Sequence, residues 1–329
     1  MKIAVLDDYA DAFRQMPDFA RLAVHEVIVY RDTIKDIVAL AERLRDAEAV
    51  VLTQERSRFP RALVERLPKL RLIAQTGSHR DHIDIAACTS RGIAISASGS
   101  GTAVPHSTVE LTWCLIIAAS RHLTYEVERF RAGAWQSTIG TELHGKTLGV
   151  YGLGRIGTAI ARVGQAFGMK VSCWGREATM NAARQAGYAV PATREEFFAG
   201  ADVLTLHIYY DEETRGIVKA ADLACMKPGA LFVNTGRAGL VEDGALVAAL
   251  RQGRPGFAAV DVYEDEPVLG ASHPLLDMPN ALCTPHLGYA VREKYAGFFR
   301  RAVDNILAFA AGQPINVINP EALAGRRIA

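Results

Sequence analysis

The sequence predicts an α/β protein in which two domains each contain a parallel sheet covered by helices. Short apolar segments alternate with helical patterns along the 329 residues, and this alternation is typical of parallel sheets with helices on both faces. A run of small residues, Ser98-Gly99-Ser100-Gly101, divides the alternation into two series. A long helical pattern follows the second series, which indicates that the chain returns to the first domain. We therefore expect one domain of residues 1–99 and 290–329, into which a second domain of residues 100–289 is inserted.

The first series consists of expected strands separated by helical patterns. The strands are apolar runs rich in β-branched residues, at 2–6, 25–30, 49–53, 70–76 and 93–96. The helical patterns span 34–44, 60–67 and 83–90, and Gly92 closes the last of them. Beyond the small-residue run, Pro105 is a favoured first-turn residue for a helix over 107–121. That helix is apolar nearly all round, which predicts that it is buried between domains or between subunits.

The second series starts at Thr147 and has the same alternation. A helix over 159–167 is expected to end at Gly168 and to lead into a strand over 170–174. Thr193 and Glu196 have the spacing of a capping box, which predicts a helix start there. Further strands are expected at 202–208, 230–234, 256–262 and 281–284, and a last helix over about 293–310, ending at Gly312 with Pro314 beyond.

Composition excludes several classes of protein. The 37 basic and 36 acidic side chains nearly cancel, which argues against a nucleic-acid partner. No apolar run is long enough to cross a membrane, and residues 2–8 form a strand with an acidic end rather than a signal peptide. The five cysteines are odd in number and lack C-x-x-C spacing, so we expect no disulfide framework, no metal site and a cytoplasmic location. They are Cys88, Cys114, Cys173, Cys225 and Cys283.

A glycine motif follows directly on the apolar strand that opens the second series. Gly152, Gly154 and Gly157 have the spacing G-x-G-x-x-G, and Arg155 and Ile156 begin the next helix. The first glycine permits a tight turn, the second lets the backbone approach a pyrophosphate, and the third lets the helix pack close to the strand. The helix N-terminus then offers free amides and a positive dipole end to the phosphates. The motif therefore predicts a dinucleotide site rather than a purely structural turn.

The residues after the following strand bear on which dinucleotide is bound. An acidic residue about 20 positions beyond the glycines would bind the ribose hydroxyls of NAD. Gly175 occupies that position, so no carboxylate repels a 2′-phosphate, and Arg176 offers a guanidinium to bind one. Two alternatives stay open: Glu177 lies close enough to act as the ribose ligand, and Arg176 could be a solvated loop residue. We expect NAD(H) or NADP(H) to bind, with a modest preference for NADP(H).

Three charged residues lie at expected strand ends, where open parallel sheets bind their ligands. Arg237 follows Asn234, Glu266 follows Asp261, and His286 follows Pro285. Hydride transfer to or from a carbinol carbon requires a proton to move at the oxygen, and a cation to hold a carboxylate and polarise the carbonyl. A histidine, its carboxylate partner and an arginine supply those needs. Considered singly, each residue could equally be an ordinary loop or surface residue.

Together these residues resemble the D-isomer-specific 2-hydroxyacid dehydrogenase family, which includes phosphoglycerate dehydrogenases and glyoxylate/hydroxypyruvate reductases. The resemblance runs nearly end to end, with the motifs in the family's order and spacing. It implies two Rossmann-like domains, with the NAD(P)-binding domain inserted into a flavodoxin-like substrate-binding domain. The matching segments are Gln75-Thr76-Gly77-Ser78, Asp81-His82-Ile83-Asp84, Glu110-Leu111-Thr112, Leu143 to Gly149, Leu206-His207, Met226-Lys227-Pro228, Asn234 to Arg237, Asp261 to Pro267 and Pro285-His286.

The resemblance also implies roles for individual residues. Arg237 would bind the substrate carboxylate and carbonyl oxygen, His286 would be the general acid in reduction, and Glu266 would favour the imidazolium. Backbone amides at Gly77 and Ser78 would hold the carboxylate. Apart from the resemblance, Arg56 follows an expected strand end and could select the substrate. Asp261 would bind the nicotinamide carboxamide. The full cofactor set implied is Thr108, Gly152, Gly154, Arg155, Ile156, Gly157, Gly175, Arg176, His207, Thr235, Gly236, Asp261 and Gly288.

Departures from the family pattern occur near the expected site. Tyr209 and Tyr210 replace the usual Pro-Leu, Ala238 replaces a glycine, and His79 stands where a second glycine is common. His79 and Arg80 are candidates for recognising an anionic substrate, with solvation of the loop as the simpler alternative.

Two classes of function follow. The favoured one is an NAD(P)-dependent D-2-hydroxyacid dehydrogenase acting on a small 2-oxo or 2-hydroxy acid. The alternative is a dinucleotide-sensing or co-repressor protein on the same scaffold. A homodimer is expected, because the helix over 107–121 is too apolar for solvent and residues 129–135 carry aromatic side chains suited to an interface.

Overall fold

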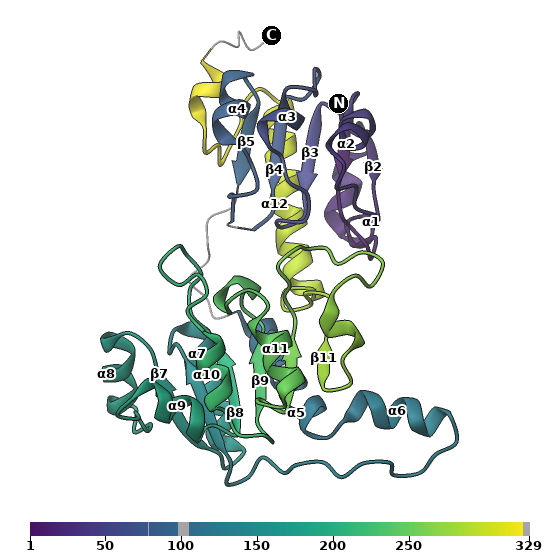
Figure 1. Ribbon diagram of the computed structural model, residues 1–329. Coiled ribbons are helices and arrows are strands. Elements are labelled where there is room, and N and C mark those ends of the chain that lie inside the picture. The colour runs from purple at the N-terminus through teal and green to yellow at the C-terminus, as the bar shows by residue number, and fades with distance from the viewer. Residues whose placement is uncertain (78, 98–104, 325–329) are drawn as a thin grey trace. The chain divides into compact units, whose positions relative to one another are not determined.

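The computed structural model describes residues 1–77, 79–97 and 105–324, and they form two compact units. Unit 1 consists of Met1–Thr102 and Arg292–Ala329, and unit 2 of Ala103–Val291. The predictions for Ser78 and for the small-residue run at 98–101 fall outside the described residues. In unit 1 the C-terminal helix α12 lies against the sheet that the N-terminal residues form (Figure 1).

Unit 1 contains a five-stranded parallel sheet in the order β2-β1-β3-β4-β5. This order is that of flavodoxin-like sheets, and it confirms the predicted fold class. The strands are β1 (Lys2–Val5), β2 (Glu26–Val29), β3 (Ala49–Leu52), β4 (Leu72–Gln75) and β5 (Ala94–Ala97).

Helices cover both faces of the unit 1 sheet. Neighbouring residues of each strand point to opposite sides, so apolar strand residues lie on both faces and both need to be covered. Ala4, Val50 and Ile73 enter one core with α2, α3 and α4. Ile3 and Val51 enter the other core with α1, η1 and α12. The helices are α1 (Ala12–Gln15), η1 (Pro17–Leu22), α2 (Ile37–Leu44), α3 (Arg61–Val64), α4 (Ile85–Ser90), α12 (Arg292–Ala310) and η4 (Pro320–Leu323).

Unit 2 contains a six-stranded parallel sheet in the order β11-β10-β9-β8-β6-β7. A parallel bridge between Ser172 and Ala189 adds a short seventh position beyond β7, which completes the Rossmann order. Successive strands are therefore added on one side of β6 up to this bridge, and from β8 onward on the other side. The strand order thus reverses between β6 and β8. The strands are β6 (Thr147–Tyr151), β7 (Lys170–Trp174), β8 (Val203–Leu206), β9 (Leu231–Asn234), β10 (Phe257–Val260) and β11 (Ala281–Cys283).

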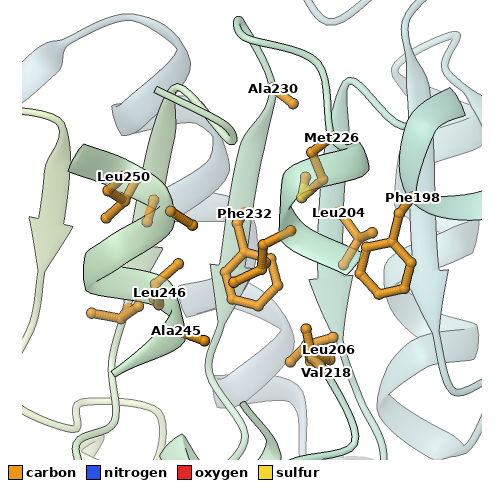
Figure 2. Packing of buried hydrophobic residues seen from close by; sticks show 14 of the residues in the cluster. Phe198, Leu204, Leu206, Val218, Met226, Ala230, Phe232, Ala245, Leu246 and Leu250 are labelled. Carbon is orange, nitrogen blue, oxygen red and sulfur yellow. The ribbon is translucent and has the colours of Figure 1, made fainter. Parts of the chain in front are cut away.

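Two hydrophobic cores lie on opposite faces of the unit 2 sheet. Figure 2 shows Phe232 of β9 among side chains of the first core, which α9, α10 and α11 cover. Leu231 and Val233, its neighbours on the strand, enter the second core with α5, α7 and α8. The helices are α5 (His106–Ser120), α6 (Leu123–Arg131), α7 (Arg155–Ala166), α8 (Glu177–Gln185), α9 (Arg194–Gly200), α10 (Ala220–Cys225), α11 (Ala245–Gln252), η2 (Ala238–Leu240) and η3 (Pro274–Asp277).

The apolar helix α5 buries its surface differently from the expectation. Val109, Trp113 and Ile116 of α5 pack into the second core of unit 2 itself, so this helix does not need another domain or subunit to cover most of its apolar surface. The structure also contains α6 and α8, which, like α1, α10 and α11, the sequence patterns did not predict. No residue of α6 is buried, and in α8 only Ala183 is. Both helices are polar on average, so few apolar residues mark them in the sequence.

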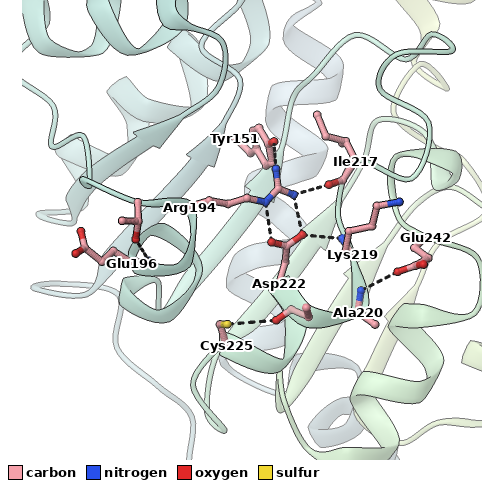
Figure 3. Close-up of polar contacts among 11 residues, drawn as sticks. Tyr151, Arg194, Glu196, Ile217, Lys219, Ala220, Asp222, Cys225 and Glu242 are labelled. Atoms are coloured by element: carbon pink, nitrogen blue, oxygen red, sulfur yellow. Dashed lines mark hydrogen bonds and ion pairs between the residues drawn. The ribbon is translucent and has the colours of Figure 1, made fainter.

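The predicted helix start at Thr193 is present as the N-cap of α9. The Thr193 hydroxyl accepts a hydrogen bond from the Glu196 amide at 3.1 Å. The next residue, Arg194, lies between Tyr151 and Asp222 (Figure 3). Its guanidinium forms a bidentate pair with Asp222, with both N–O distances 2.7 Å, and donates to the Tyr151 hydroxyl at 2.8 Å. This network ties α9 and α10 to the end of β6, directly before the glycine motif.

Candidate active site

The strands of the unit 2 sheet are parallel, so their C-terminal ends lie together along what we call its carboxyl edge. The candidate residues that directly follow these strands lie there. The glycine motif follows β6, Arg176 follows β7, and His207 follows β8. On the other half of the same edge, Arg237 follows β9, Glu266 follows β10 and His286 follows β11. Ligands of open α/β sheets bind at this edge, beside the point where the strand order reverses. The sheet order therefore places the glycine motif, Arg176 and His207 on one half of the edge. The catalytic candidates lie on the other half, together with the remaining cofactor candidates that follow strands, Thr235, Gly236, Asp261 and Gly288.

The glycine motif forms a turn that two of its glycines make sterically possible. Gly152 has a φ of +94°, and a Cβ there would lie 2.6 Å from the carbonyl oxygen of His207. A Cβ on Gly157 would lie 2.0 Å from the Gly152 carbonyl oxygen. At Gly154, the N-cap of α7, no atom lies within 4 Å of an added Cβ. The first and third glycines thus allow the strand, the turn and the helix to approach closely, and the second leaves open space at the helix N-terminus for a phosphate.

The side chains around Arg176 are arranged as ion pairs. Arg176 is the N-cap residue of α8, and its Nη2 lies 3.0 Å from Oε2 of Glu213. Glu177, the alternative ribose ligand, pairs instead with Arg184 further along α8, at 3.5 Å. The carboxylate beside Arg176 therefore comes from the loop after β8, at a distance of 37 residues in the sequence.

His207 is held in its neutral form at the end of β8. Burial lowers the pKa of this histidine to about 3, because an imidazolium there would be removed from water. Its Nε2 contacts the Thr205 hydroxyl at 3.0 Å. His207 is therefore suited to hydrogen bonding and not to donating a proton near neutral pH.

His286 and Glu266 form a short hydrogen-bonded pair in the candidate site. Nδ1 of His286 lies 2.5 Å from Oε2 of Glu266, and their side chains are only 18% and 17% exposed. The other carboxylate oxygen of Glu266 accepts a hydrogen bond from the Tyr263 amide at 2.9 Å. Because Glu266 binds Nδ1, it fixes the orientation of the ring, and a proton transfer to a ligand would involve the opposite nitrogen, Nε2.

Asp261 organises the turn that carries His286. His286 adopts a φ of +53°, in the left-handed region that non-glycine residues rarely occupy. The carboxylate of Asp261 accepts hydrogen bonds from the backbone amides of Leu287 and Gly288, at 2.7 and 2.9 Å, and from the Thr284 hydroxyl at 2.6 Å. Burial raises the pKa of Asp261, and these three hydrogen bonds oppose that rise. Thr108 of α5 adds a hydrogen bond to the Gly288 carbonyl at 3.1 Å.

Arg237 lies in a turn that the buried Asn234 shapes. The Asn234 side chain accepts from the Gly236 amide at 3.0 Å and donates to the Arg237 carbonyl at 2.9 Å. The Arg237 guanidinium donates to the Gly236 carbonyl at 2.9 Å. Thr235, a predicted cofactor residue, is buried, and its hydroxyl contacts that of Thr112 on α5 at 2.8 Å. Its side chain therefore fixes α5 to the sheet edge.

The candidate substrate residues of unit 1 lie on the loops after β3 and β4. Gly77 has a φ of +81°, and an added Cβ there would lie 2.7 Å from Oε1 of Gln54. The backbone amide of Gln54 donates to the Thr76 hydroxyl at 3.0 Å, and this hydrogen bond joins the two loops. Arg56 is only 8% exposed. Nδ1 of His79 lies 3.9 Å from Oε1 of Glu55. Ser78 is outside the described residues.

Glu213 could not have been found from the sequence, because Arg176 is 37 residues away and no motif marks Glu213. Gln54 and Thr284 lie at expected strand ends, and only their contacts with Thr76 and Asp261 were not visible. The role of Asn234 had a weak signal, because it opens the segment that leads to Arg237.

Comparison with known proteins identifies the family. The model of the NAD binding domain of D-isomer specific 2-hydroxyacid dehydrogenases matches residues 113–288. The chain is 35% identical over 298 residues to a glyoxylate reductase of Aeropyrum pernix, covering 88% of each chain. It is 31% identical to a hydroxypyruvate reductase of Blautia hydrogenotrophica, covering 97% of this chain and 100% of the other. A solved phosphoglycerate oxidoreductase of Vibrio cholerae is 46% identical, with a TM-score of 0.89 and coverage of 95% and 99%.

The chain belongs to the D-isomer specific 2-hydroxyacid dehydrogenase family, as the sequence motifs predicted. It is an oxidoreductase that binds a nicotinamide dinucleotide, and the comparisons do not support the sensing or co-repressor alternative. Across the described ranges, no helix has the length and apolar character needed to span a membrane. In the same ranges, no three His, Cys, Asp or Glu side chains are grouped as metal ligands.

Proposed function

We propose that this enzyme interconverts a small 2-oxo acid and its D-2-hydroxy acid with Arg237, Glu266 and His286 as catalytic residues. The single observation that carries the assignment is the pair of His286 and Glu266, 2.5 Å apart and mostly buried at the carboxyl edge of the sheet. A mostly buried histidine–carboxylate pair contributes little to stability, so its position at a ligand-binding edge favours a role in chemistry.

The proposed reduction divides the work among these side chains. Reduced nicotinamide, when bound, supplies a hydride for the carbonyl carbon of the 2-oxo acid. His286 donates a proton from Nε2 to the carbonyl oxygen, and the products are the 2-hydroxy acid and the oxidised cofactor. Glu266 stabilises the imidazolium before the transfer, and Arg237 holds the carboxylate and polarises the carbonyl. In oxidation the neutral imidazole accepts the proton.

The substrate class is a short 2-oxo acid, by analogy with the glyoxylate and hydroxypyruvate reductases that the chain resembles. We assign Gly77 and Ser78 to the substrate, as the family pattern implies, and Arg56 because it lies on the loop after β3. The direct test is oxidation of NADH and NADPH, followed at the nicotinamide absorbance, with glyoxylate, hydroxypyruvate, pyruvate and bulkier 2-oxo acids. Turnover of at least one acid is expected, and turnover of none would refute the function.

For the cofactor we propose use of both nicotinamides, with a modest preference for NADP(H). Arg176 supports this because it lies directly after β7, where Gly175 replaces an acidic residue. Replacing Arg176 with Ala should raise the KM for NADPH about tenfold, the lower end for a charge-assisted hydrogen bond at an exposed site, and leave the KM for NADH nearly unchanged. Arg184→Ala on the same helix is the matched control, since Arg184 pairs with Glu177. Equal effects of Arg176→Ala on both cofactors would contradict the assignment.

We further propose a homodimer in which α6 and the segment after it contact the second copy. Figure 1 shows α6 extending away from the sheet of unit 2. Phe130 and Trp135 pack edge to face, with ring centroids 5.7 Å apart, yet they are 63% and 76% exposed. Glu126 holds the following segment by accepting from the Thr138 hydroxyl at 2.6 Å. A hollow of about 990 Å³ lies beside this segment and is lined partly by Ile139, which is 95% exposed.

An apolar projection beside an open hollow is suited to a two-fold interface, in which each copy offers both parts. Phe130→Asp should therefore convert the dimer to a monomer in light scattering at micromolar concentration. Val24→Asp in unit 1 is the control, because Val24 is exposed but remote from α6 in the sequence and in a different unit. A monomeric wild-type protein would refute the dimer.

The cysteines support a reducing compartment, and we propose the cytoplasm. All five are free thiols. Burial raises the pKa of Cys88 and of Cys173 to about 12, so these two remain protonated and unreactive.

A further inference from the structure

The ion pair between Arg176 and Glu213 connects two loops at the cofactor half of the sheet edge. Arg176 follows β7, and Glu213 lies in the loop after β8. Nη2 of Arg176 donates to Oε2 of Glu213 at 3.0 Å. Within the described ranges, the neighbouring acidic side chains are paired elsewhere: Glu177 with Arg184 and Glu212 with Arg215. Glu213 is therefore the carboxylate that occupies the Arg176 guanidinium.

The backbone at Glu213 belongs to a hydrogen-bonded turn that the buried Thr214 anchors, so the carboxylate is presented from a defined position. Thr214 is 3% exposed. Its hydroxyl donates to the Tyr209 carbonyl at 2.8 Å, and its amide donates to the Asp211 side chain at 3.0 Å. The Asp211 amide in turn donates to the Thr214 hydroxyl at 2.8 Å. Although the Glu213 side chain itself is exposed, its Cα cannot move away from Arg176 without breaking these bonds.

We propose that Glu213 is a specificity-determining residue that competes with the 2′-phosphate of NADP(H) for Arg176. This inference rests on the proposed role of Arg176 in binding that phosphate. A 2′-phosphate that docks on the guanidinium must displace the carboxylate or lie beside it, and both cost free energy because the two groups are anionic. The ribose 2′-hydroxyl of NAD(H) is neutral and need not displace it. Glu213 therefore lowers affinity for NADP(H) selectively and limits the preference that Arg176 provides.

The size of the effect follows from exposure. The Arg176 and Glu213 side chains are 72% and 81% exposed, and exposed ion pairs are weak because water and salt screen them. The competition is therefore modest, and we expect a change of about two- to fivefold in the dissociation constant of NADPH. The pair adjusts cofactor preference without abolishing the use of either cofactor.

The test is a set of fluorescence titrations of the intact protein with NADPH and NADH. Glu213→Gln should tighten NADPH binding about two- to fivefold and change NADH binding less than twofold. Glu212→Gln is the matched control, because it removes the same charge one residue away. The Glu212 carboxylate pairs with Arg215 and not with Arg176. In an Arg176→Ala background, Glu213→Gln should lose its effect, because the guanidinium for which it competes is absent.

Three outcomes would overturn the inference. Equal gains from Glu213→Gln and Glu212→Gln would show a general field of negative charge. A gain that persists without Arg176 would show direct repulsion of the phosphate. No gain from Glu213→Gln, together with weaker NADPH binding in Arg176→Ala, would refute the competition and leave the role of Arg176 intact. If Arg176→Ala weakens both cofactors equally, the proposed cofactor preference itself fails.

Discussion

His286→Ala is expected to lower turnover by roughly 10²–10⁴-fold, the usual contribution of general acid–base catalysis. The carbonyl oxygen must gain a proton as hydride arrives at the carbon, and water is a poor substitute for an imidazolium held by Glu266 at 2.5 Å. Cofactor affinity should change little, because the glycine turn lies after β6, on the other half of the sheet edge. Steady-state kinetics with the best 2-oxo acid and fluorescence titration with NADH measure the two effects separately.

Glu266→Gln tests the other side chain of the same pair. The amide replaces the charged acceptor of the Nδ1 hydrogen bond by a neutral group, so the ring of His286 is oriented less firmly. Turnover should fall about tenfold, the smaller end for a hydrogen bond to a charged group, while NADH affinity should stay unchanged. Near-normal turnover in His286→Ala would contradict the assignment. His207 would be a poor replacement, since burial lowers its pKa to about 3, and His79 would become the candidate acid.

Gly157→Ala is expected to disrupt both the fold of unit 2 and cofactor binding. The added Cβ would lie 2.0 Å from the Gly152 carbonyl oxygen and 3.2 Å from Cγ1 of Val150. The closest atom belongs to the backbone of the glycine turn, so relief requires α7 to move away from β6. Overpacking usually costs about 1–3 kcal/mol, and we expect a loss of about 3 kcal/mol in the free energy of unfolding, because a backbone atom cannot rotate aside. Urea denaturation and NADH titration would measure the two losses.

Gly154→Ala is the control for that substitution, because it adds the same methyl group three residues earlier, where the structure leaves open space. No atom lies within 4 Å of an added Cβ at Gly154, so the free energy of unfolding should change little. NADH affinity should nevertheless fall, since the methyl group would occupy the space through which the pyrophosphate approaches the helix N-terminus. Equal stability of Gly157→Ala and wild type would show that α7 adjusts without cost.

Much of the fold was predictable because it depends on local patterns. The strand over 170–174 agrees with β7 residue for residue. The strand expected at 93–96 lies one residue later, as β5. Most other strands are one to three residues shorter than expected: the apolar run over 70–76 contains β4 at Leu72–Gln75 only. The flanking Leu70 is buried but belongs to a turn, since its amide donates to the Leu67 carbonyl. Hydrophobicity marks burial, whereas strand ends depend on which residues find partners in the neighbouring strand.

The candidate site divides in the same way. The glycine spacing and the strand ends that carry Arg237, Glu266 and His286 were visible in the chain, and the roles of these residues remain predictions. The hydrogen bonds that shape the site were not visible. The left-handed turn at His286 depends on Asp261, which lies 25 residues earlier in the sequence, directly after the neighbouring strand β10. Such partners follow from strand order, which no short motif encodes.

By itself the sequence determined the family, the two parallel α/β sheets and the positions of the dinucleotide motif, because periodic burial and glycine spacing are local properties of the chain. The tertiary structure alone decided which charged side chains meet. It paired Arg176 with Glu213 and not with its chain neighbour Glu177, because Glu177 faces along α8 toward Arg184 while the loop after β8 approaches the end of β7. Contacts of this kind depend on the relative positions of separate strands, and residue identity along the chain does not specify them.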